Sequence, residues 1–233
     1  MEQRIAEWNE RFAKAPAEEA LDFFIKAFGK GLCLSSSMGA EDQVLIHMLT
    51  SIDPDIRVFT LDTGRMFPET YKLIDRTNRH FNIKIEVYFP DFSGVQKMVW
   101  EKGINLFYES IENRKLCCSI RKVEPLKRAL DGMQAWITGI RKDQTIERFN
   151  TNLIEWDDNN NLLKINPIYR WTEKMVWDYI KSNAIPYNEL FDKGFRSIGC
   201  QPCTRAVGPD EDPRAGRWWW EDSGHKECGL HIK

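Results

Sequence analysis

The chain has 233 residues, with 33 lysines and arginines against 35 aspartates and glutamates and a net charge of −2. It lacks the basic excess of proteins that bind nucleic acid in bulk, and no apolar run is long enough for a membrane span. The charged start, Met1–Arg4, is unlike a secretory signal peptide. We therefore expect a cytoplasmic protein whose six cysteines stay reduced and serve a purpose other than disulfide formation.

Helical and extended patterns alternate along most of the chain. Apolar spacing predicts helices at 2–14, 17–28, 41–50, 68–81, 92–101, 120–130 and 172–182. Short apolar runs predict strands at 32–34, 57–61, 83–89 and 135–138. A hairpin is expected at 153–156 and 162–165, because the polar residues 157–161 separate two apolar runs.

This alternation predicts the α/β class, with a mostly parallel sheet that carries helices on both faces. The length fits one domain with a full core plus appendages. We expect that domain to span 1–208 and to contain the functional site. Residues 209–216 have the composition of a flexible, charged link, so 209–233 is expected to be a mobile C-terminal segment. No apolar helix face is left over to indicate an oligomer, so a homo-oligomer stays an open alternative.

The loop after the first predicted strand, Ser35–Asp42, has the composition of an anion site. Small residues let the backbone approach an anion, hydroxyl groups donate to it, and the following helix N-terminus favours negative charge. A plain strand-to-helix turn with serine caps is the alternative. The turn Asp62–Gly64 ends the next strand, and the carboxyl ends of parallel strands border one crevice.

Four of the cysteines form two tight groups. Cys117 and Cys118 are adjacent, and Cys200 and Cys203 form a Cys-x-x-Cys motif. Four thiolates in such groups suit a closed metal site. Neighbouring side chains diverge, which makes one zinc ion less suitable than a cluster whose irons can take the sulfurs separately. We therefore favour [4Fe–4S] over zinc, with packing or a strained disulfide as the alternative for the adjacent pair alone.

The remaining cysteines differ in their surroundings. Cys33 lies in a predicted buried strand and is interpreted as a small apolar side chain. Cys228 lies five residues from the end, between Lys226 and His231, where a nearby cation favours the nucleophilic thiolate. An exposed cysteine without function is the alternative. Basic residues accompany the cysteine motifs and strand ends, and we interpret them as converging on an anionic ligand.

Taken together, these motifs closely resemble one family, the assimilatory iron–sulfur adenylyl-sulfate (APS) reductases, relatives of the PAPS reductases. The resemblance spans most of the chain. Its motifs are 35–42, 61–64, Cys117-Cys118 with Arg121-Lys122, 139–144, 200–203, 214–219 and 226–231.

The resemblance implies an adenine-nucleotide α-hydrolase-like fold, a [4Fe–4S] cluster on the four paired cysteines, and reduction of APS to sulfite and AMP. Cys228 would be the catalytic nucleophile and would form an S-sulfocysteine. A second thiol must release sulfite, and the family's donor is thioredoxin, with a glutaredoxin-like dithiol as a variant. The cysteine pairs favour APS over PAPS, although a PAPS or dual-specificity reductase stays an alternative.

By the same resemblance, the remaining site residues bind substrate. They are Ser35, Ser36, Ser37, Gly39, Leu61, Asp62, Thr63, Gly64, Lys122, Arg141, Arg214, Arg217 and His231.

Two other classes are weighed against the reductase. A tRNA-thiolating ATP-pyrophosphatase relative would carry a more glycine-rich phosphate loop and a basic surface for tRNA. A zinc-stabilised binding module would be colourless and would have no use for Cys228. Neither accounts for the whole set of motifs.

Overall fold

The computed structural model describes residues 1–145 and 148–221. Cys228 and His231 lie outside these residues, together with the rest of 222–233, the last part of the C-terminal segment expected at 209–233. None of the helices in the described ranges is both long and apolar enough to cross a bilayer.

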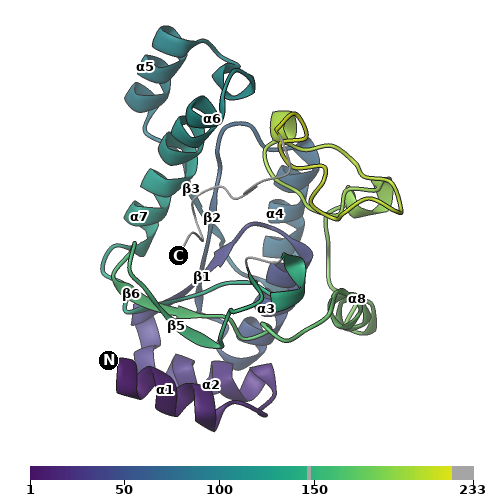
Figure 1. The fold of residues 1–233 in the computed structure, drawn as a ribbon. Helices are drawn as coiled ribbons and strands as arrows, with labels where there is room; N and C mark the ends of the chain where they lie inside the picture. Colours follow the sequence, from purple (N-terminus) through teal and green to yellow (C-terminus); the bar gives the residue numbers. More distant parts are fainter. Residues whose placement is uncertain (146–147, 222–233) are drawn as a thin grey trace. The chain divides into compact units, whose positions relative to one another are not determined.

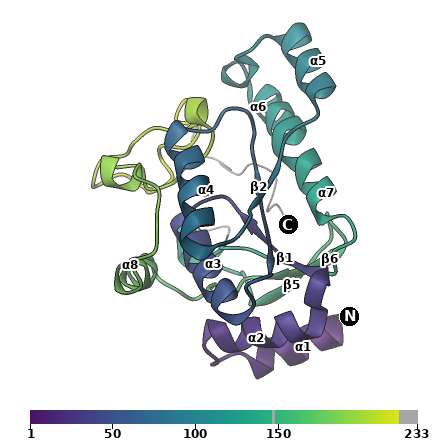
Figure 2. The same cartoon turned by 180° about the vertical axis from the view of Figure 1, so that it is seen from behind.

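The chain forms two compact units (Figures 1 and 2). The first contains Met1–Thr60, Lys72–Glu86 and Gly132–Asn188, and the second contains Leu61–Tyr71, Val87–Asp131 and Glu189–Lys233. This grouping follows contacts within each unit, and the expected boundary at residue 208 stays a prediction.

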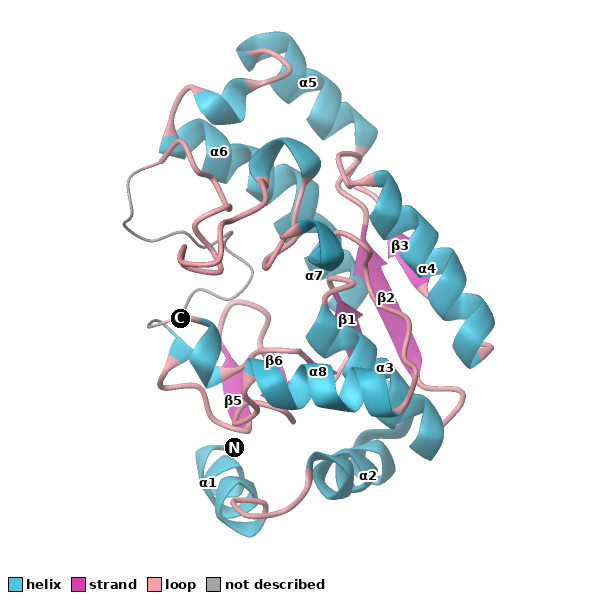
Figure 3. Cartoon of the chain, turned by 90° about the vertical axis from the view of Figure 1, so that its right-hand side faces the viewer, coloured by secondary structure: helices cyan, strands magenta, loops and turns pink. Residues whose placement is uncertain are grey.

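The chain forms a six-stranded sheet in the order β3-β2-β1-β4-β6-β5, and Figure 3 draws strands in magenta. The strands are β1 (Leu32–Ser36), β2 (Arg57–Leu61), β3 (Glu86–Tyr88), β4 (Ala135–Ile137), β5 (Ile154–Asp157) and β6 (Leu162–Ile165). β1 pairs in parallel with β2 and β4, β4 pairs in parallel with β6, and β5 is antiparallel to β6. The prediction of an α/β fold with a mostly parallel sheet is confirmed.

The central strands are buried along almost their whole length, as expected for parallel strands covered by helices. All residues of β4 and β6 are buried. The helices that begin in the first unit are α1 (Glu2–Arg11), α2 (Ala17–Phe28), α3 (Ala40–Ile52) and α8 (Glu173–Ser182). α2 and α3 pack against β1, α8 packs on α3, and α1 packs on β5. Trp8 and Phe24 join α1 to α2 through an edge-to-face contact at 5.5 Å.

The second unit contains α5 (Phe92–Lys102), α6 (Ile111–Cys118) and α7 (Glu124–Leu130), and α5 and α6 contribute to this unit's own core. α4 (Pro68–Phe81) begins in this unit and continues in the first. The core combines apolar side chains with thiols, namely Met98, Leu106, Phe107, Cys117, Cys118, Cys203 and Trp218. The cysteine motifs are therefore part of the packing of this unit.

Three predicted elements differ from the structure. β1 extends to Ser36, so the loop is shorter than expected. β3 contains only three residues, because the chain before it is bonded back to α4: Ile83 N donates to Asn78 O at 3.1 Å and Ile85 N donates to Asn78 Oδ1 at 2.9 Å. The helix predicted at 120–130 is preceded by α6, and a π-helical turn at Ser119–Val123 links α6 to α7. The adjacent cysteines are thus helical.

Candidate active site

The loop after β1 is closed by the carboxylate of Asp42. Its Oδ2 accepts hydrogen bonds from Ser37 N at 2.6 Å, Ser37 Oγ at 2.7 Å and Gly39 N at 3.3 Å. Met38 between these residues has a positive φ of 62°, a conformation that costs energy without such support. Burial raises the pKa of Asp42 to about 6, although the Ser37 hydrogen bonds oppose this effect. The backbone N–H groups of Ser37 and Gly39 therefore both donate to the Asp42 carboxylate.

Arg141 adjoins this loop within the first unit. Its guanidinium is buried and forms ion pairs with Glu41 at 2.9 Å and Asp143 at 3.1 Å. Gly139 lies so close to α3 that a Cβ there would be 2.6 Å from Asp42 Oδ1. The structure therefore brings the end of β4 next to the first turn of α3, as expected for neighbouring parallel strands.

The Asp62–Gly64 turn lies in the second unit and is held from several sides. Asp62 Oδ1 accepts hydrogen bonds from Gly64 N at 2.7 Å and from the Tyr71 hydroxyl at 2.9 Å. Arg121 Nη1 donates to Thr63 O at 2.6 Å. Gly64 has a φ of +71°, which glycine adopts without steric cost. The turn is therefore rigid and directly linked to the helix that follows the adjacent cysteines.

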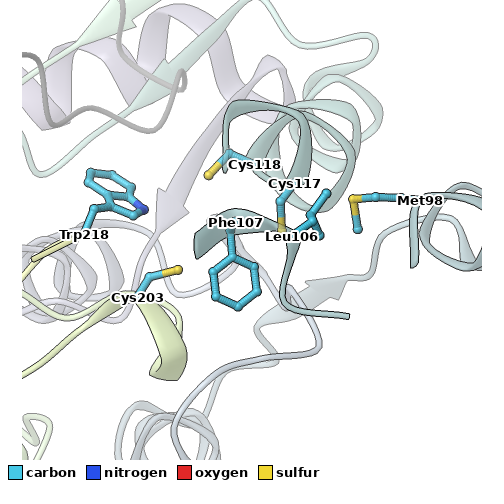
Figure 4. Packing of buried hydrophobic residues seen from close by; sticks show 7 residues of the cluster. All are labelled: Met98, Leu106, Phe107, Cys117, Cys118, Cys203 and Trp218. Atoms are coloured by element: carbon cyan, nitrogen blue, oxygen red, sulfur yellow. The ribbon is translucent and has the colours of Figure 1, made fainter. Parts of the chain in front are cut away.

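All four paired cysteines line one cavity in the second unit. Figure 4 shows Cys118 and Cys203 reaching toward a common space, one from α6 and the other from the turn at 201–203, with Phe107 and Trp218 beside them. Thr63 Oγ1 lies 3.2 Å from Cys200 Sγ. Across the described ranges, no three Cys, His, Asp or Glu side chains are arranged to hold a single ion. The thiols surround a space instead of converging on one point.

The cavity is strongly basic as well as thiol-rich. Its other lining residues are Arg65, Phe107, Arg114, Arg121, Lys122 and Pro202. Burial raises the pKa of Cys200, but the charge of Lys122, the Thr63 hydrogen bond and the charge of Arg217 outweigh it and lower that pKa overall. Burial raises the pKa of Cys203 to about 12. Thiolates in this cavity are therefore favoured by nearby cations and opposed by desolvation.

The predicted basic residues near the end of the chain differ in their surroundings. Arg217 is buried, stacks over the Trp218 ring at 4.7 Å and approaches Ser197 Oγ at 3.4 Å. Arg214 lies in a short turn in which its backbone N donates to Asp212 Oδ1 at 2.8 Å. Both arginines belong to the second unit, together with Lys122 and the Asp62–Gly64 turn.

Comparison with known proteins places most of the chain, including these site residues up to residue 206, in one family. Residues 31–206 match the phosphoadenosine phosphosulfate reductase domain. The chain belongs to the phosphoadenosine phosphosulfate reductase family. As a member of a reductase family, it is an oxidoreductase.

Curated relatives in this family are similar to the chain over most of their length. Adenosine 5′-phosphosulfate reductase from Burkholderia cepacia is 46% identical over 217 residues, covering 92% of this chain and 87% of the relative. The reductase of the same name from Allochromatium vinosum is 48% identical over 202 residues, covering 87% of this chain and 79% of the relative.

The similar solved structures include a reductase of the same family and a more distant protein that shares the fold. Phosphoadenylyl-sulfate (PAPS) reductase from Candida auris, crystallised as a phosphate complex, superposes with a TM-score of 0.76 and 29% identity, covering 89% of this chain and 98% of the other. FMN adenylyltransferase from Candida glabrata, at 14% identity and a TM-score of 0.57, covering 93% of this chain and 77% of the other, shares the fold.

Sequence reasoning missed Phe107 and two basic residues of the reductase's thiol-lined cavity. Arg114 lines it and forms a buried ion pair with Glu221. Arg65 lines it too, donating to Ile104 O at 2.6 Å. The signal for Arg114 was its position three and four residues before Cys117 and Cys118, which is one helical turn. This spacing is informative only if the residues are helical, and the apolar pattern did not predict α6.

Proposed function

We propose that this reductase converts adenosine 5′-phosphosulfate (APS) to sulfite and AMP, in assimilatory sulfate reduction and cysteine biosynthesis. The observation that carries the proposal is 45–48% identity to proteins named adenosine 5′-phosphosulfate reductase, across 75–87% of their length. The cytoplasm would keep the described cysteines, which are all free, in their reduced form.

We infer that Cys228 is the nucleophile. Its thiolate attacks the sulfur of the sulfate–phosphate anhydride, an S–S bond forms, and the bond from sulfur to the bridging oxygen breaks. AMP leaves with the electron pair of that bond, and the enzyme carries an S-sulfocysteine. Cationic groups would stabilise the negative charge on the sulfate and phosphate oxygens as the bond breaks. The candidates are Lys122, Arg141, Arg214 and Arg217.

The second step needs a thiol that the described chain does not offer. Cys33 is fully buried in β1, and burial raises its pKa to about 12, so it is a poor nucleophile. The other four described cysteines line the cavity. One thiol of an external dithiol, thioredoxin or a glutaredoxin-like protein, would attack Cys228 Sγ, and sulfite would leave with the electron pair of the S–S bond. The second thiol would then attack the resulting mixed disulfide, freeing the Cys228 thiol and leaving the dithiol as a disulfide. Two electrons pass from the dithiol to the sulfur that leaves as sulfite.

We infer that the cavity would hold a [4Fe–4S] cluster in preference to a single zinc ion, because the adjacent side chains of Cys117 and Cys118 suit a cluster that can take the two sulfurs on different irons. Four thiols line this cavity, and Arg121 and Lys122 would offset the negative charge that four thiolates bring. Cys117, Cys118, Cys200 and Cys203 would be the ligands. When bound, such a cluster would supply structural support and a local electrostatic field, while the external dithiol supplies the electrons.

We propose two groups of substrate-binding residues, one on each unit. Ser35, Ser36, Ser37 and Gly39 would receive part of the nucleotide in the first unit. Leu61 and the Asp62–Gly64 turn would do so in the second. His231 would orient the C-terminal segment or assist proton transfer.

PAPS reduction is the second candidate, because the matching domain family and the Candida auris structure carry that name. Incubation of the purified protein with APS or PAPS under argon, without thiol, followed by peptide mass spectrometry, separates the two. We expect a sulfite-sized adduct on Cys228 with APS, and none in Cys228→Ser, with Cys33→Ala as a control that keeps it. An adduct with PAPS alone, or none with either nucleotide, would contradict the proposal.

A further inference from the structure

The chain from Cys203 to Trp218 doubles back on itself as a loop, all of it in the second unit. Trp218 N donates to Cys203 O at 3.1 Å, and Arg205 N donates to Gly216 O at 3.0 Å. A Cβ on Gly216 would overlap Arg205 O, so the two arms of the loop are in direct contact. The residues between the arms form the loop tip, and Arg214 belongs to it.

Glu211 fastens the loop tip to the first arm through three hydrogen bonds. Its Oε1 accepts from Arg205 Nη2 at 2.6 Å, and its Oε2 accepts from Arg205 Nη1 at 3.0 Å and from Gly208 N at 2.7 Å. These hydrogen bonds, chiefly that from Arg205, lower the pKa of Glu211 to about 2. A two-point contact between a guanidinium and a carboxylate fixes orientation as well as distance.

Arg214 lies three residues after Glu211, in a turn that is bonded at both ends. Arg214 N donates to Asp212 Oδ1 at 2.8 Å, and Arg217 N donates to Arg214 O at 2.9 Å. Asp212 directly follows Glu211, and Arg217 belongs to the second arm. The half-buried Arg214 side chain therefore starts from a backbone whose place is set by Glu211 on one side and by the second arm on the other.

We propose that Glu211 is a positioning residue for nucleotide binding. Through its contact with Arg205 it holds the loop closed, and the closed loop places Arg214 for the anionic end of the substrate. This inference rests on the proposed function of Arg214 and adds two residues to it. Neither Glu211 nor Arg205 lines the thiol-lined cavity, and neither is proposed to touch the substrate.

The exposure of the ion pair indicates what it contributes. Both side chains are 40% exposed, and pairs at such exposure add little to the stability of the whole protein. Ligand affinity responds differently, because it falls in proportion to the fraction of molecules in the binding-competent form. A variant whose loop is closed in about a tenth of the molecules would bind about tenfold more weakly, while the rest of the protein stays folded.

Three variants separate the ion pair from the arginine that it is proposed to place. Glu211→Gln keeps the size of the side chain and removes its charge. Arg205→Lys keeps the charge but replaces the rigid two-point contact by a single ammonium group, so its effect should be intermediate. It also continues the test if Glu211→Gln does not fold. Arg214→Ala removes the guanidinium itself.

The matched control is Glu86→Gln. Glu86 forms an equivalent two-point contact, accepting from Arg57 Nε at 3.0 Å and from Arg57 Nη2 at 2.8 Å. Its side chain is 44% exposed, close to the 40% of Glu211. Both members of this pair belong to the first unit, so the control makes the same chemical change away from the loop.

Two measurements follow the loop and the ligand separately. Trypsin cleavage after Arg214, mapped by mass spectrometry, reports loop opening, because cleavage of a transiently opened segment tracks its open population. Calorimetry gives the Kd for ADP, in which a second phosphate stands where APS has sulfate, so binding is measured without reaction. Glu211→Gln should speed this cleavage at least tenfold and raise the Kd about tenfold. Cleavage after Lys174, whose side chain is 83% exposed in the first unit, should not change.

A double-mutant cycle shows whether Glu211 acts through Arg214. We expect Glu211→Gln to raise the Kd for ADP about tenfold in the unmodified protein. The same change should raise it less than twofold in the Arg214→Ala protein, where the guanidinium to be placed is absent. Glu86→Gln should leave both the cleavage rate and the Kd within twofold of the unmodified protein.

Three results would overturn the positioning role. The first is a folded Glu211→Gln protein whose cleavage rate and Kd both stay within threefold of the unmodified protein. The second is an equal loss of affinity with and without Arg214, because Glu211 would then act by another route. The third is unchanged ADP binding by Arg214→Ala. In that case the proposed function of Arg214 fails as well, and this is visible before any Glu211 variant is compared.

Discussion

Arg141 Nε and Nη2 both lie 2.9 Å from Glu41 Oε1. Arg141 also pairs with Asp143 at 3.1 Å and donates to Trp171 O at 3.1 Å. In this structure two carboxylates balance the charge of a guanidinium that we propose for binding an anion. An anionic nucleotide that uses Arg141 therefore competes with Glu41, and Glu41 becomes a determinant of affinity.

Replacement of Glu41 by Gln should strengthen nucleotide binding. We expect the Kd for AMP to fall three- to tenfold, equivalent to about 0.7–1.4 kcal/mol, because a like charge is removed beside the ligand. Stability should fall by about 1–2 kcal/mol, less than for complete loss of a buried partner, because Asp143 remains. Titration calorimetry and urea unfolding measure the two effects. The more exposed Asp143→Asn is the control and should change Kd less. Unchanged or weaker binding by folded Glu41→Gln would exclude this role.

The pH dependence of stability should report on Asp42. Burial raises its pKa to about 6, against about 3.9 in an unfolded chain. The folded state holds the proton more tightly, so this stabilising contribution is full below about pH 4 and is lost as pH rises through about 6. The free energy of unfolding, relative to Asp42→Asn, should drop by roughly 3 kcal/mol across that window.

Urea unfolding of both proteins at pH 4, 5, 6 and 7 measures this difference. Asn cannot titrate, so subtracting its curve removes the contribution of other groups. A difference that stays flat, or that rises with pH, would show that the hydrogen bonds from Ser37 and Gly39 outweigh burial at this carboxylate.

Local apolar spacing predicted most of the fold. β2 and α4 begin and end at the predicted residues, because each has an apolar face that its own sequence defines. α6 escaped prediction since its middle, Glu112–Lys115, is polar. Its first turn is capped by Ser110 Oγ, which accepts from Asn113 N at 3.1 Å. The buried face of α6 contains Arg114, whose partner Glu221 lies 107 residues away. No local pattern contains that information.

The candidate site was predictable where a motif carries its own chemistry. The spacing of the cysteines predicted one shared site, and all four line one cavity. The basic residues were predicted as a group that faces an anion, but the partners of Arg141 could not be predicted. Those partners depend on the packing of β4 against α3, which brings together residues 100 positions apart.

Single replacements of the paired cysteines should remove iron. We expect Cys117→Ser, Cys118→Ser, Cys200→Ser and Cys203→Ser each to lose most of the iron and the visible absorbance, because a closed site needs all four ligands. Cys33→Ala is the control, since Cys33 lies in β1 away from the cavity lining, and it should keep both. Anaerobic purification with metal analysis and absorption spectroscopy tests this. A colourless protein that contains zinc would contradict the cluster.

Gly139→Ala should distort the loop after β1, which we propose for nucleotide binding. Its Cβ would lie 2.6 Å from Asp42 Oδ1 and 2.9 Å from Glu41 Cβ, so the first turn of α3 must move. Overpacking of this kind costs about 1–3 kcal/mol, and the displaced Asp42 would no longer hold the Ser37 and Gly39 amides. We expect lower stability and at least tenfold weaker AMP binding, measured by urea unfolding and calorimetry.

Gly94→Ala is the matched control for this substitution. Gly94 lies in α5, and its added Cβ would meet Ile120 at an ordinary 3.5 Å. Alanine also favours a helix over glycine by about 0.5–1 kcal/mol, so this variant should be as stable as the unmodified protein or more so, with unchanged AMP affinity. Equal AMP binding by both glycine variants would show that the close approach of Gly139 to Asp42 does not affect nucleotide binding by the loop after β1.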